Sequence, residues 1–296
     1  MRHLTLIGID IGGTAVKAGI VKDGAIVTKI VELLQRRDPQ KSVLETVDKV
    51  LSKYDGSVSA VGIATAGRVD SERGLVLYSS GNIPGWSGVN LSKIVTERFH
   101  LPVYVLNDAR AAALAESRAR NIKNLVMLTI GTGLGGGIVI NGKVVFGNKW
   151  EAGEIGHAIL YPNGRKCNCG KKGCAESYIS MKVLHRYTRL KDRRVLIDRF
   201  NNDDLKVVNA VEKIANDLAI VIDRVFLEFD PELVVIGGGF TELGDKALRI
   251  VRDKVEFHAT RSLYNILQVQ FSVLGNDAGI IGASIFAEES INAGDE

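Results

Sequence analysis

Apolar residues come in short runs that end at glycine-rich turns. Leu4–Ile9 and Ala15–Val21 are two such runs, joined by residues 10–14, and a third run covers residues 25–33. Apolar runs of this length, bounded by Gly and Asp, are typical of β-strands. The chain is therefore expected to open with a meander of three strands.

The second half of the chain repeats this opening. The apolar run Leu125–Ile130 is followed by the glycine-rich residues 131–137, a second apolar run at Ile138–Ile140 and a turn at residues 141–142. A strand, a Gly/Thr turn and a second strand thus occur twice, and this repetition predicts two related substructures.

Other stretches have apolar residues at every third or fourth position, which predicts helices. Ser42–Glu45 matches a capping box for a helix ending near Tyr54, residues 109–120 are rich in alanine, and residues 208–225 are amphipathic. Further strands are expected at residues 58–65, 103–106, 233–236 and 267–273, and Asp277 is expected to cap a last helix. Because strands and helices are interleaved, the expected fold class is α/β.

Length and charge narrow the class of protein. The chain has 296 residues, of which 46% are hydrophobic, so it is long enough for two domains. Its 38 basic and 34 acidic residues are mixed along the chain, which favours a solvated surface and no nucleic-acid partner. No apolar run is long enough for a signal peptide or a membrane span. We therefore expect a soluble, cytoplasmic protein.

The three cysteines form one tight group. Cys167, Cys169 and Cys174 are an odd number in a short segment, which argues against a disulfide framework. With His157 they make a Cys₃His set, a common zinc ligand set. Four protein ligands leave no open position for water, so the sequence predicts a structural zinc rather than a catalytic one.

Glycine turns follow three predicted strands, at Asp10–Thr14, Gly131–Gly135 and Gly237–Gly239. Backbone amides in such turns approach an anion closely. Gly131-Thr132-Gly133 lacks the Gly-Lys-Ser/Thr ending of a Walker A loop, and Gly12-Gly13-Thr14 does not match the dinucleotide fingerprint. A single glycine turn is more often a plain hairpin, but three of them favour a site for a polyphosphate.

These motifs carry a family resemblance over Leu6 to Ala287. Asp10-Ile11-Gly12-Gly13-Thr14, Gly131-Thr132-Gly133-Leu134-Gly135 and the late Gly-Gly-Gly resemble the two phosphate motifs and the adenosine motif of the actin/hexokinase/Hsp70 ATPase superfamily. The spacing His-x9-Cys-x-Cys-x4-Cys is similar to the signature of the ROK family of sugar kinases and repressors. The resemblance implies two ribonuclease-H-like (actin-like ATPase) lobes with a cleft between them, formed by residues 1–115 plus 278–296 and by residues 116–277.

The resemblance also implies an activity: ATP-dependent phosphorylation of a free hexose at its 6-hydroxyl, with glucose as the first candidate, by a homodimer or homotetramer. It makes Asp108 the catalytic base and Asp10 a carboxylate that holds Mg²⁺ through water. The implied nucleotide contacts are Asp10, Gly12, Gly13, Thr14, Lys17, Gly131, Thr132, Gly133, Gly135, Gly237, Gly238 and Gly239. The implied sugar contacts are Asn82, Asn107, Asp108, Glu154, His157 and Glu176.

Several alternatives stay open at this stage. Without the resemblance, the sequence favours Asn107 or Asp108 as only an N-cap of the alanine-rich helix. Trp86 could be a packing residue or a substrate contact. N-acetylmannosamine, allose, mannose or fructose could replace glucose, and polyphosphate or another nucleotide could replace ATP. A sugar-sensing regulator of the same family would need a helix-turn-helix domain before the first motif, and only six residues precede Ile7. An ATPase that uses no sugar would leave the cysteine group unexplained.

Overall fold

The computed structural model describes residues 4–79, 81, 83–259 and 268–294, and the chain divides into two compact units. Each unit is assembled from separate parts of the sequence. Unit 1 comprises Met1–Ala119, Val144–Ala152 and Asn276–Glu296, and unit 2 comprises Arg120–Lys143 and Gly153–Gly275.

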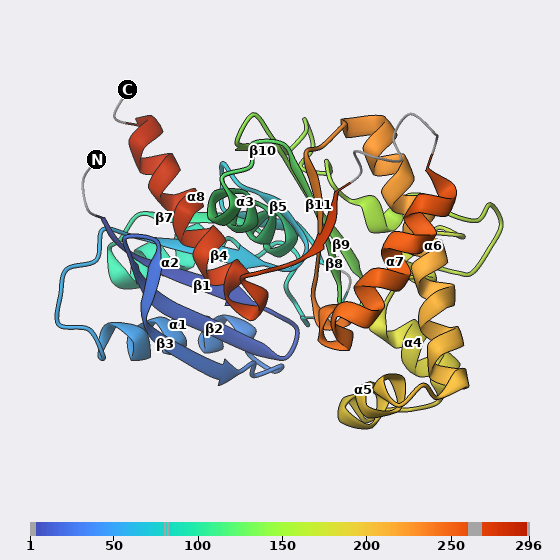
Figure 1. The fold of residues 1–296 in the computed structure, drawn as a ribbon. Helices are drawn as coiled ribbons and strands as arrows, with labels where there is room; N and C mark the ends of the chain where they lie inside the picture. Colours follow the sequence, from blue (N-terminus) through green and yellow to red (C-terminus); the bar gives the residue numbers. More distant parts are fainter. Residues whose placement is uncertain (1–3, 80, 82, 260–267, 295–296) are drawn as a thin grey trace. The chain divides into compact units, whose positions relative to one another are not determined.

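Unit 1 is built on a five-stranded sheet in the order β3-β2-β1-β4-β7 (Figure 1). β1 pairs antiparallel with β2, and β2 pairs antiparallel with β3, so the predicted opening meander is confirmed. β1 also pairs parallel with β4, and β4 runs parallel to β7. The strands are β1 (Thr5–Ile11), β2 (Ala15–Lys22), β3 (Ala25–Leu33), β4 (Ala60–Thr65) and β7 (Val103–Asn107). A separate hairpin pairs β5 (Arg68–Asp70) with β6 (Leu75–Tyr78).

Unit 2 contains a second five-stranded sheet, in the order β10-β9-β8-β11-β12. β8 pairs antiparallel with β9 and parallel with β11, and β11 runs parallel to β12. The strand order, and the directions of the β8–β9, β8–β11 and β11–β12 pairs, therefore match those of the first sheet, which confirms the predicted repeat. The strands are β8 (Leu125–Ile130), β9 (Leu134–Ile140), β10 (Lys143–Val144), β11 (Leu233–Gly237) and β12 (Val269–Phe271).

Helices are interleaved with these strands, as expected for an α/β fold. Those of unit 1 are α1 (Pro39–Leu51), α2 (Leu91–Phe99), α3 (Asp108–Arg120) and α8 (Ala278–Gly294). Those of unit 2 are α4 (Met181–Thr188), α5 (Arg193–Asn201), α6 (Leu205–Phe229) and α7 (Gly244–His258), with 3₁₀ turns η1 (Ile155–His157), η2 (Ala175–Ser177) and η3 (Gly239–Leu243); a further 3₁₀ turn, η4 (Gly275–Asp277), precedes α8.

The last helix, α8, packs unusually closely on the sheet of unit 1. It contacts β1, β4 and β7, and its backbone lies directly against Gly8 of β1 and Gly62 of β4. A Cβ at either glycine would overlap the carbonyl of Ile280 or Ala283. Gly282 of α8 likewise lies against the Ala111 carbonyl of α3. The absence of side chains at these positions therefore sets how closely α8 approaches its neighbours.

Three elements, α1, β9 and β12, differ in extent from what the sequence predicts. The Ser42 capping box is wrong, because α1 begins one turn earlier, where Asp38 caps it by accepting from the Lys41 amide and Pro39 occupies the first turn. The glycine run 131–137 is only partly a loop, since β9 already begins at Leu134. Of the expected strand 267–273, residue 267 lies outside the described residues and β12 covers only Val269–Phe271.

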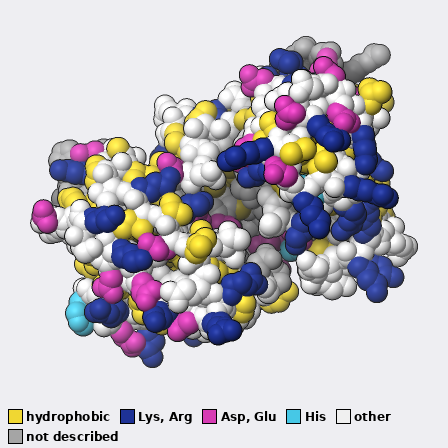
Figure 2. All heavy atoms as spheres, turned by 90° about the horizontal axis from the view of Figure 1, so that it is seen from below, with side chains coloured by type: hydrophobic (Ala, Val, Ile, Leu, Met, Phe, Trp, Pro, Cys, Tyr) yellow, Lys and Arg dark blue, Asp and Glu magenta, His cyan; other side chains and the backbone are white. Residues whose placement is uncertain are grey.

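Among the residues described here, no helix has both the length and the apolar character needed to cross a membrane. Figure 2 shows basic and acidic side chains interspersed over one face, together with scattered hydrophobic ones.

Candidate functional site

The first glycine turn joins β1 to β2 in unit 1. Gly12 donates its amide to the Ala15 carbonyl at 2.9 Å, which closes the turn over Gly13 and Thr14. Asp10 lies opposite Lys17 in the antiparallel pair, and the Lys17 Nζ is 2.9 Å from its Oδ2. Asp10 keeps only 15% of its side-chain surface exposed. The structure thus places the predicted Asp10 and Lys17 together beside the turn.

The start of α8 packs against Asp10 from another side. A Cβ at Gly279 would come within 2.6 Å of the Asp10 Cγ, so only glycine leaves room for the carboxyl group. Sequence reasoning missed this residue, because a glycine inside a predicted helix gives no sign of what it faces.

Asn107 ends β7 and Asp108 begins α3. Asn107 is buried; its Oδ1 accepts from the amides of Ala109 and Arg110, and its Nδ2 donates to the Gly67 carbonyl at 3.0 Å. Asn107 therefore serves as the helix cap. The partly exposed Asp108 also accepts from the Ala109 amide, at 2.9 Å.

Sheet register relates Asp108 to the first turn. β1, β4 and β7 run parallel, and the register places Asp10 beside Ala64, and Ala64 beside Leu106. Asp10 and Leu106 are therefore two strand spacings apart, about 10 Å, and Asp108 follows two residues after Leu106. The turn and the carboxylate lie at the same edge of one sheet.

Two further sequence expectations concern residues 82 and 86. Asn82 lies outside the described residues. Trp86 is 1% exposed, belongs to the hydrophobic core of unit 1 and donates its Nε1 hydrogen to Thr65 Oγ1 at 2.9 Å. The structure thus gives Trp86 a packing role.

Arg110 is a residue whose role the sequence did not reveal. It is buried two positions after Asp108, and its Nη2 donates to the carbonyls of Trp150 and Ala152, both at 2.8 Å. Its guanidinium also lies over the ring of Phe146. Arg110 therefore holds residues 146–152 against α3, directly before the predicted sugar ligand Glu154.

The second and third glycine turns lie side by side in unit 2. Gly131–Gly133 follow β8, and Gly237–Gly239 end and follow the adjacent parallel strand β11. Gly238 has φ +78°, and a Cβ there would come within 2.6 Å of the Ile130 carbonyl, immediately before Gly131. The structure therefore brings together the two turns expected to bind phosphate and adenosine.

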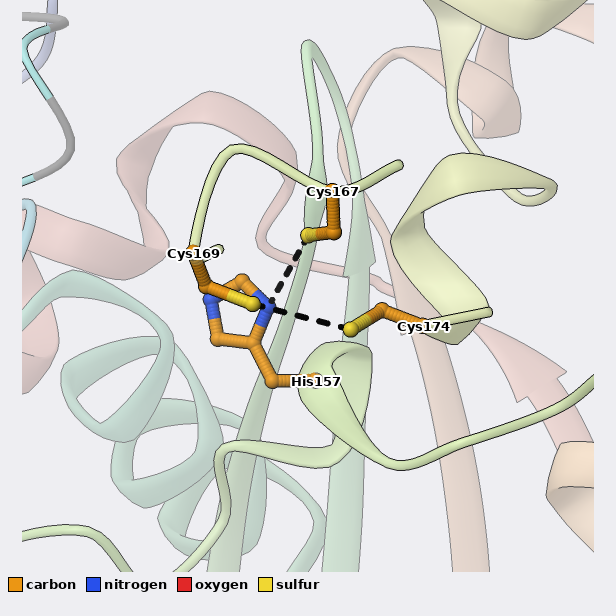
Figure 3. A group of neighbouring side chains, drawn as sticks. All are labelled: His157, Cys167, Cys169 and Cys174. Atoms are coloured by element: carbon orange, nitrogen blue, oxygen red, sulfur yellow. Dashed lines mark hydrogen bonds between the residues drawn. The ribbon is translucent and has the colours of Figure 1, made fainter. Parts of the chain in front are cut away.

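His157, Cys167, Cys169 and Cys174 converge on one point (Figure 3). Their ligand atoms all lie within 4.8 Å of one another, with 3.6 Å between the sulfurs of Cys169 and Cys174. The His157 Nδ1 is 3.7 Å from the Cys167 sulfur, so this nitrogen faces the thiols. The four residues predicted as a metal set are thus neighbours.

Ionisation of the thiols is uneven. Burial raises the pKa of Cys167 and raises that of Cys174 to about 12. Burial opposes ionisation of Cys169 as well, but hydrogen bonds from the Lys171 backbone and the other two thiols outweigh it and lower its pKa.

The predicted sugar carboxylates flank this cluster. Glu154 is exposed and immediately precedes η1, which carries His157. Glu176 lies in η2, where its Oε2 accepts from the Leu134 amide at 3.2 Å and its Oε1 is 4.0 Å from the Cys167 sulfur.

A polar cluster ties the cysteine segment, which we take as residues 157–180, to α6. Tyr161 donates its hydroxyl hydrogen to the buried Asp217 at 2.6 Å. This hydrogen bond, with burial, raises the pKa of Tyr161 to about 12, and burial raises the pKa of Asp217. Arg165 stacks on Tyr178 and donates to the hydroxyl of Tyr187. The sequence did not predict this cluster, because its members are far apart along the chain.

Comparison with known proteins gives consistent matches over almost the whole chain. The model of the ROK family matches residues 6–290. A protein of Thermotoga maritima named glucokinase is 32% identical, covering 98% of this chain and 99% of its own. An N-acetylmannosamine kinase of Haemophilus influenzae is 30% identical, covering 96% and 95%. A crystal structure of a ROK family glucokinase from Streptomyces griseus with glucose and AMPPNP aligns with a TM-score of 0.86, at 30% identity, covering 96% and 99%.

Proposed function

Because this chain belongs to the ROK family and has its actin-like ATPase fold, we propose that it is a sugar kinase that transfers the γ-phosphoryl group of ATP to the 6-hydroxyl of a free hexose. The observation that carries the proposal lies in unit 1, where the partly exposed carboxylate of Asp108 shares a sheet edge with the Asp10–Thr14 turn. Glucose is the first candidate substrate, because the relatives described above include glucokinases and one is bound to glucose.

Asp108 has the chemistry that phosphoryl transfer needs from the protein. A carboxylate within hydrogen-bond reach of the sugar hydroxyl accepts its proton as the oxygen attacks phosphorus. Asn107 supports this role, because its side chain caps α3 and thereby fixes the backbone that carries Asp108. The second Nδ2 hydrogen of Asn107 is suited to a sugar hydroxyl.

Nucleotide binding is assigned to the three glycine turns. Amides of the first two turns would stabilise the phosphate oxygens, and the Gly237–Gly239 turn would receive the adenosine. Asp10 would hold Mg²⁺ through water beside Lys17, and the bound ion would neutralise charge on the phosphates.

The cysteine cluster fits zinc. Four tetrahedral bonds of about 2.3 Å place two thiolate sulfurs about 3.8 Å apart, and Cys169 and Cys174 are already at 3.6 Å. Bound zinc would tie residues 157–174 into one rigid segment. With Nδ1 of His157 on the metal, its Nε2 would remain for a sugar hydroxyl, beside Glu154 and Glu176.

N-acetylmannosamine is the second candidate substrate, because one relative at 30% identity is a kinase of that sugar. The test is to incubate the protein with Mg-ATP and, separately, glucose, mannose, fructose, allose, N-acetylglucosamine and N-acetylmannosamine, and to follow the products by phosphorus NMR. We expect one sugar to give a 6-phosphate ester. Sugar binding without any ester would instead indicate a sugar sensor.

A further inference from the structure

Glu176 connects two parts of unit 2 to which the proposed function assigns different substrates. The cysteine cluster is assigned to the sugar side, and the second phosphate turn is assigned to the nucleotide. One carboxylate oxygen lies at the cysteine cluster, 4.0 Å from the Cys167 sulfur, and the other accepts from the Leu134 amide at 3.2 Å. Leu134 begins β9, immediately after the Gly131–Gly133 turn. A single side chain therefore connects the cysteine segment to the second phosphate turn.

Gly133, the last glycine of this turn, lies where a side chain would meet Glu176. A Cβ at Gly133 would overlap the Glu176 carboxylate, although nothing lies within 4 Å of the corresponding position at Gly131. Residue 133 therefore lacks a side chain where Glu176 approaches, and a larger residue there would displace this carboxylate.

Two backbone contacts join the same parts. The Met181 amide, at the start of α4, donates to the Gly131 carbonyl at 2.8 Å. Gly156, next to His157, lies so close to the Leu134 carbonyl that a Cβ would overlap it. The turn is thus held by residues from before, within and after the cysteine segment, and of these three contacts only that of Glu176 is a side-chain hydrogen bond.

We propose that Glu176 is a positioning residue for the second phosphate turn, and that through it the affinity for nucleotide depends on the order of the metal-binding segment. This inference rests on the proposed function and extends it, because it gives Glu176 a role in nucleotide binding when no sugar is present. A carboxylate that contacts the turn with one oxygen and a sugar hydroxyl with the other would also couple the two binding equilibria.

The test measures binding of Mg-AMPPNP by calorimetry, without sugar. Glu176→Ala should weaken binding about tenfold or more, because the Leu134 amide loses its acceptor. Glu176→Gln should stay within about threefold of wild type, because its amide oxygen still accepts that bond. Ser177→Ala is the matched control, since the neighbouring hydroxyl donates to the Lys166 carbonyl within the segment, and it should change nothing. Metal content and melting temperature are recorded for each variant.

Chelation tests the link to the metal. Removing the metal from wild type should weaken AMPPNP binding, and removing it from Glu176→Ala should add little further loss. Unchanged sugar-free affinity in Glu176→Ala would overturn the proposal, as would equal losses in the Ala and Gln variants or no effect of chelation on wild type. A wild-type protein that binds AMPPNP but phosphorylates no sugar would refute only the proposed function. Sugar phosphorylation with unchanged AMPPNP affinity in Glu176→Ala would refute only the role given to Glu176.

Discussion

At the residue scale, Asn107 and Asp108 divide two tasks that the sequence could not separate. Either residue could have been the helix cap, and the structure gives that place to Asn107, whose Oδ1 accepts from two amides of α3. Asp108 then begins the helix with its carboxylate partly exposed. In the proposed function, Asp108 accepts the sugar proton and Asn107 fixes the backbone that carries it.

The buried Asp217 predicts a pH dependence of stability. Burial raises its pKa in the folded protein, so the fold favours the protonated carboxyl group. Stability from this group is full below the unfolded-state pKa of about 4 and falls as pH rises through the higher folded-state pKa. Asp217→Asn should therefore gain stability relative to wild type as pH rises through this window. Urea unfolding at several pH values checks this, and a stability difference that is independent of pH would contradict it.

Residues known from motifs were predicted, whereas those defined by packing were not. The glycine turns, Asp108 and the Cys₃His set stand in local patterns that the sequence displays. The contacts of Arg110 with residues 150 and 152, and of Tyr161 with Asp217, join residues far apart in the chain. Only the folded structure decides such pairs.

At the element scale, close packing of α8 predicts a stability effect. Gly282→Ala should destabilise the protein by about 1–3 kcal/mol, because the new methyl group would overlap the Ala111 carbonyl of α3. Gly294→Ala, at the end of the same helix, has nothing within 4 Å of its Cβ position and should stay within about 0.5 kcal/mol of wild type. Urea unfolding of both variants makes the comparison, and equal effects would show that α8 is not held by close contact at Gly282.

The cysteine segment predicts an effect of metal removal. Between His157 and α4 it has no α-helix and a single 3₁₀ turn, η2, so bound metal should supply much of its order. We expect purified protein to contain zinc and its melting temperature to fall by about 5 °C or more on chelation. Adding zinc back should restore the original temperature. Protein without metal whose melting temperature ignores both chelator and zinc would contradict this.

Strands and helices were predicted well where the apolar pattern was long, and less well at their ends. The start of α1 was misplaced because Ser42 and Glu45 match a capping box, although Asp38 and Pro39 provide an earlier start. The start of β9 was missed because glycines 135–137 lack the apolar side chains that indicate a strand. Pairing with β8 nevertheless keeps them extended.

At the scale of the whole molecule, two sheets with the same strand order divide the proposed chemistry. The sheet of unit 1 carries the first glycine turn and Asp108, and the sheet of unit 2 carries the other two turns and the cysteine cluster. The sequence predicted this repeat from the recurrence of strand, Gly/Thr turn and strand. It did not predict that residues 144–152 belong to unit 1, because that assignment depends on contacts such as those made by Arg110.

The central claim is that Asp108 is the catalytic base of sugar-dependent phosphoryl transfer. The most direct measurement is ADP release from Mg-ATP, with and without the preferred hexose, in wild type and in Asp108→Asn. Wild type should release ADP only with sugar, and Asp108→Asn should lower kcat about 10³-fold while AMPPNP affinity stays within about threefold. ADP release that needs no sugar, or that Asp108→Asn leaves unchanged, would contradict the account.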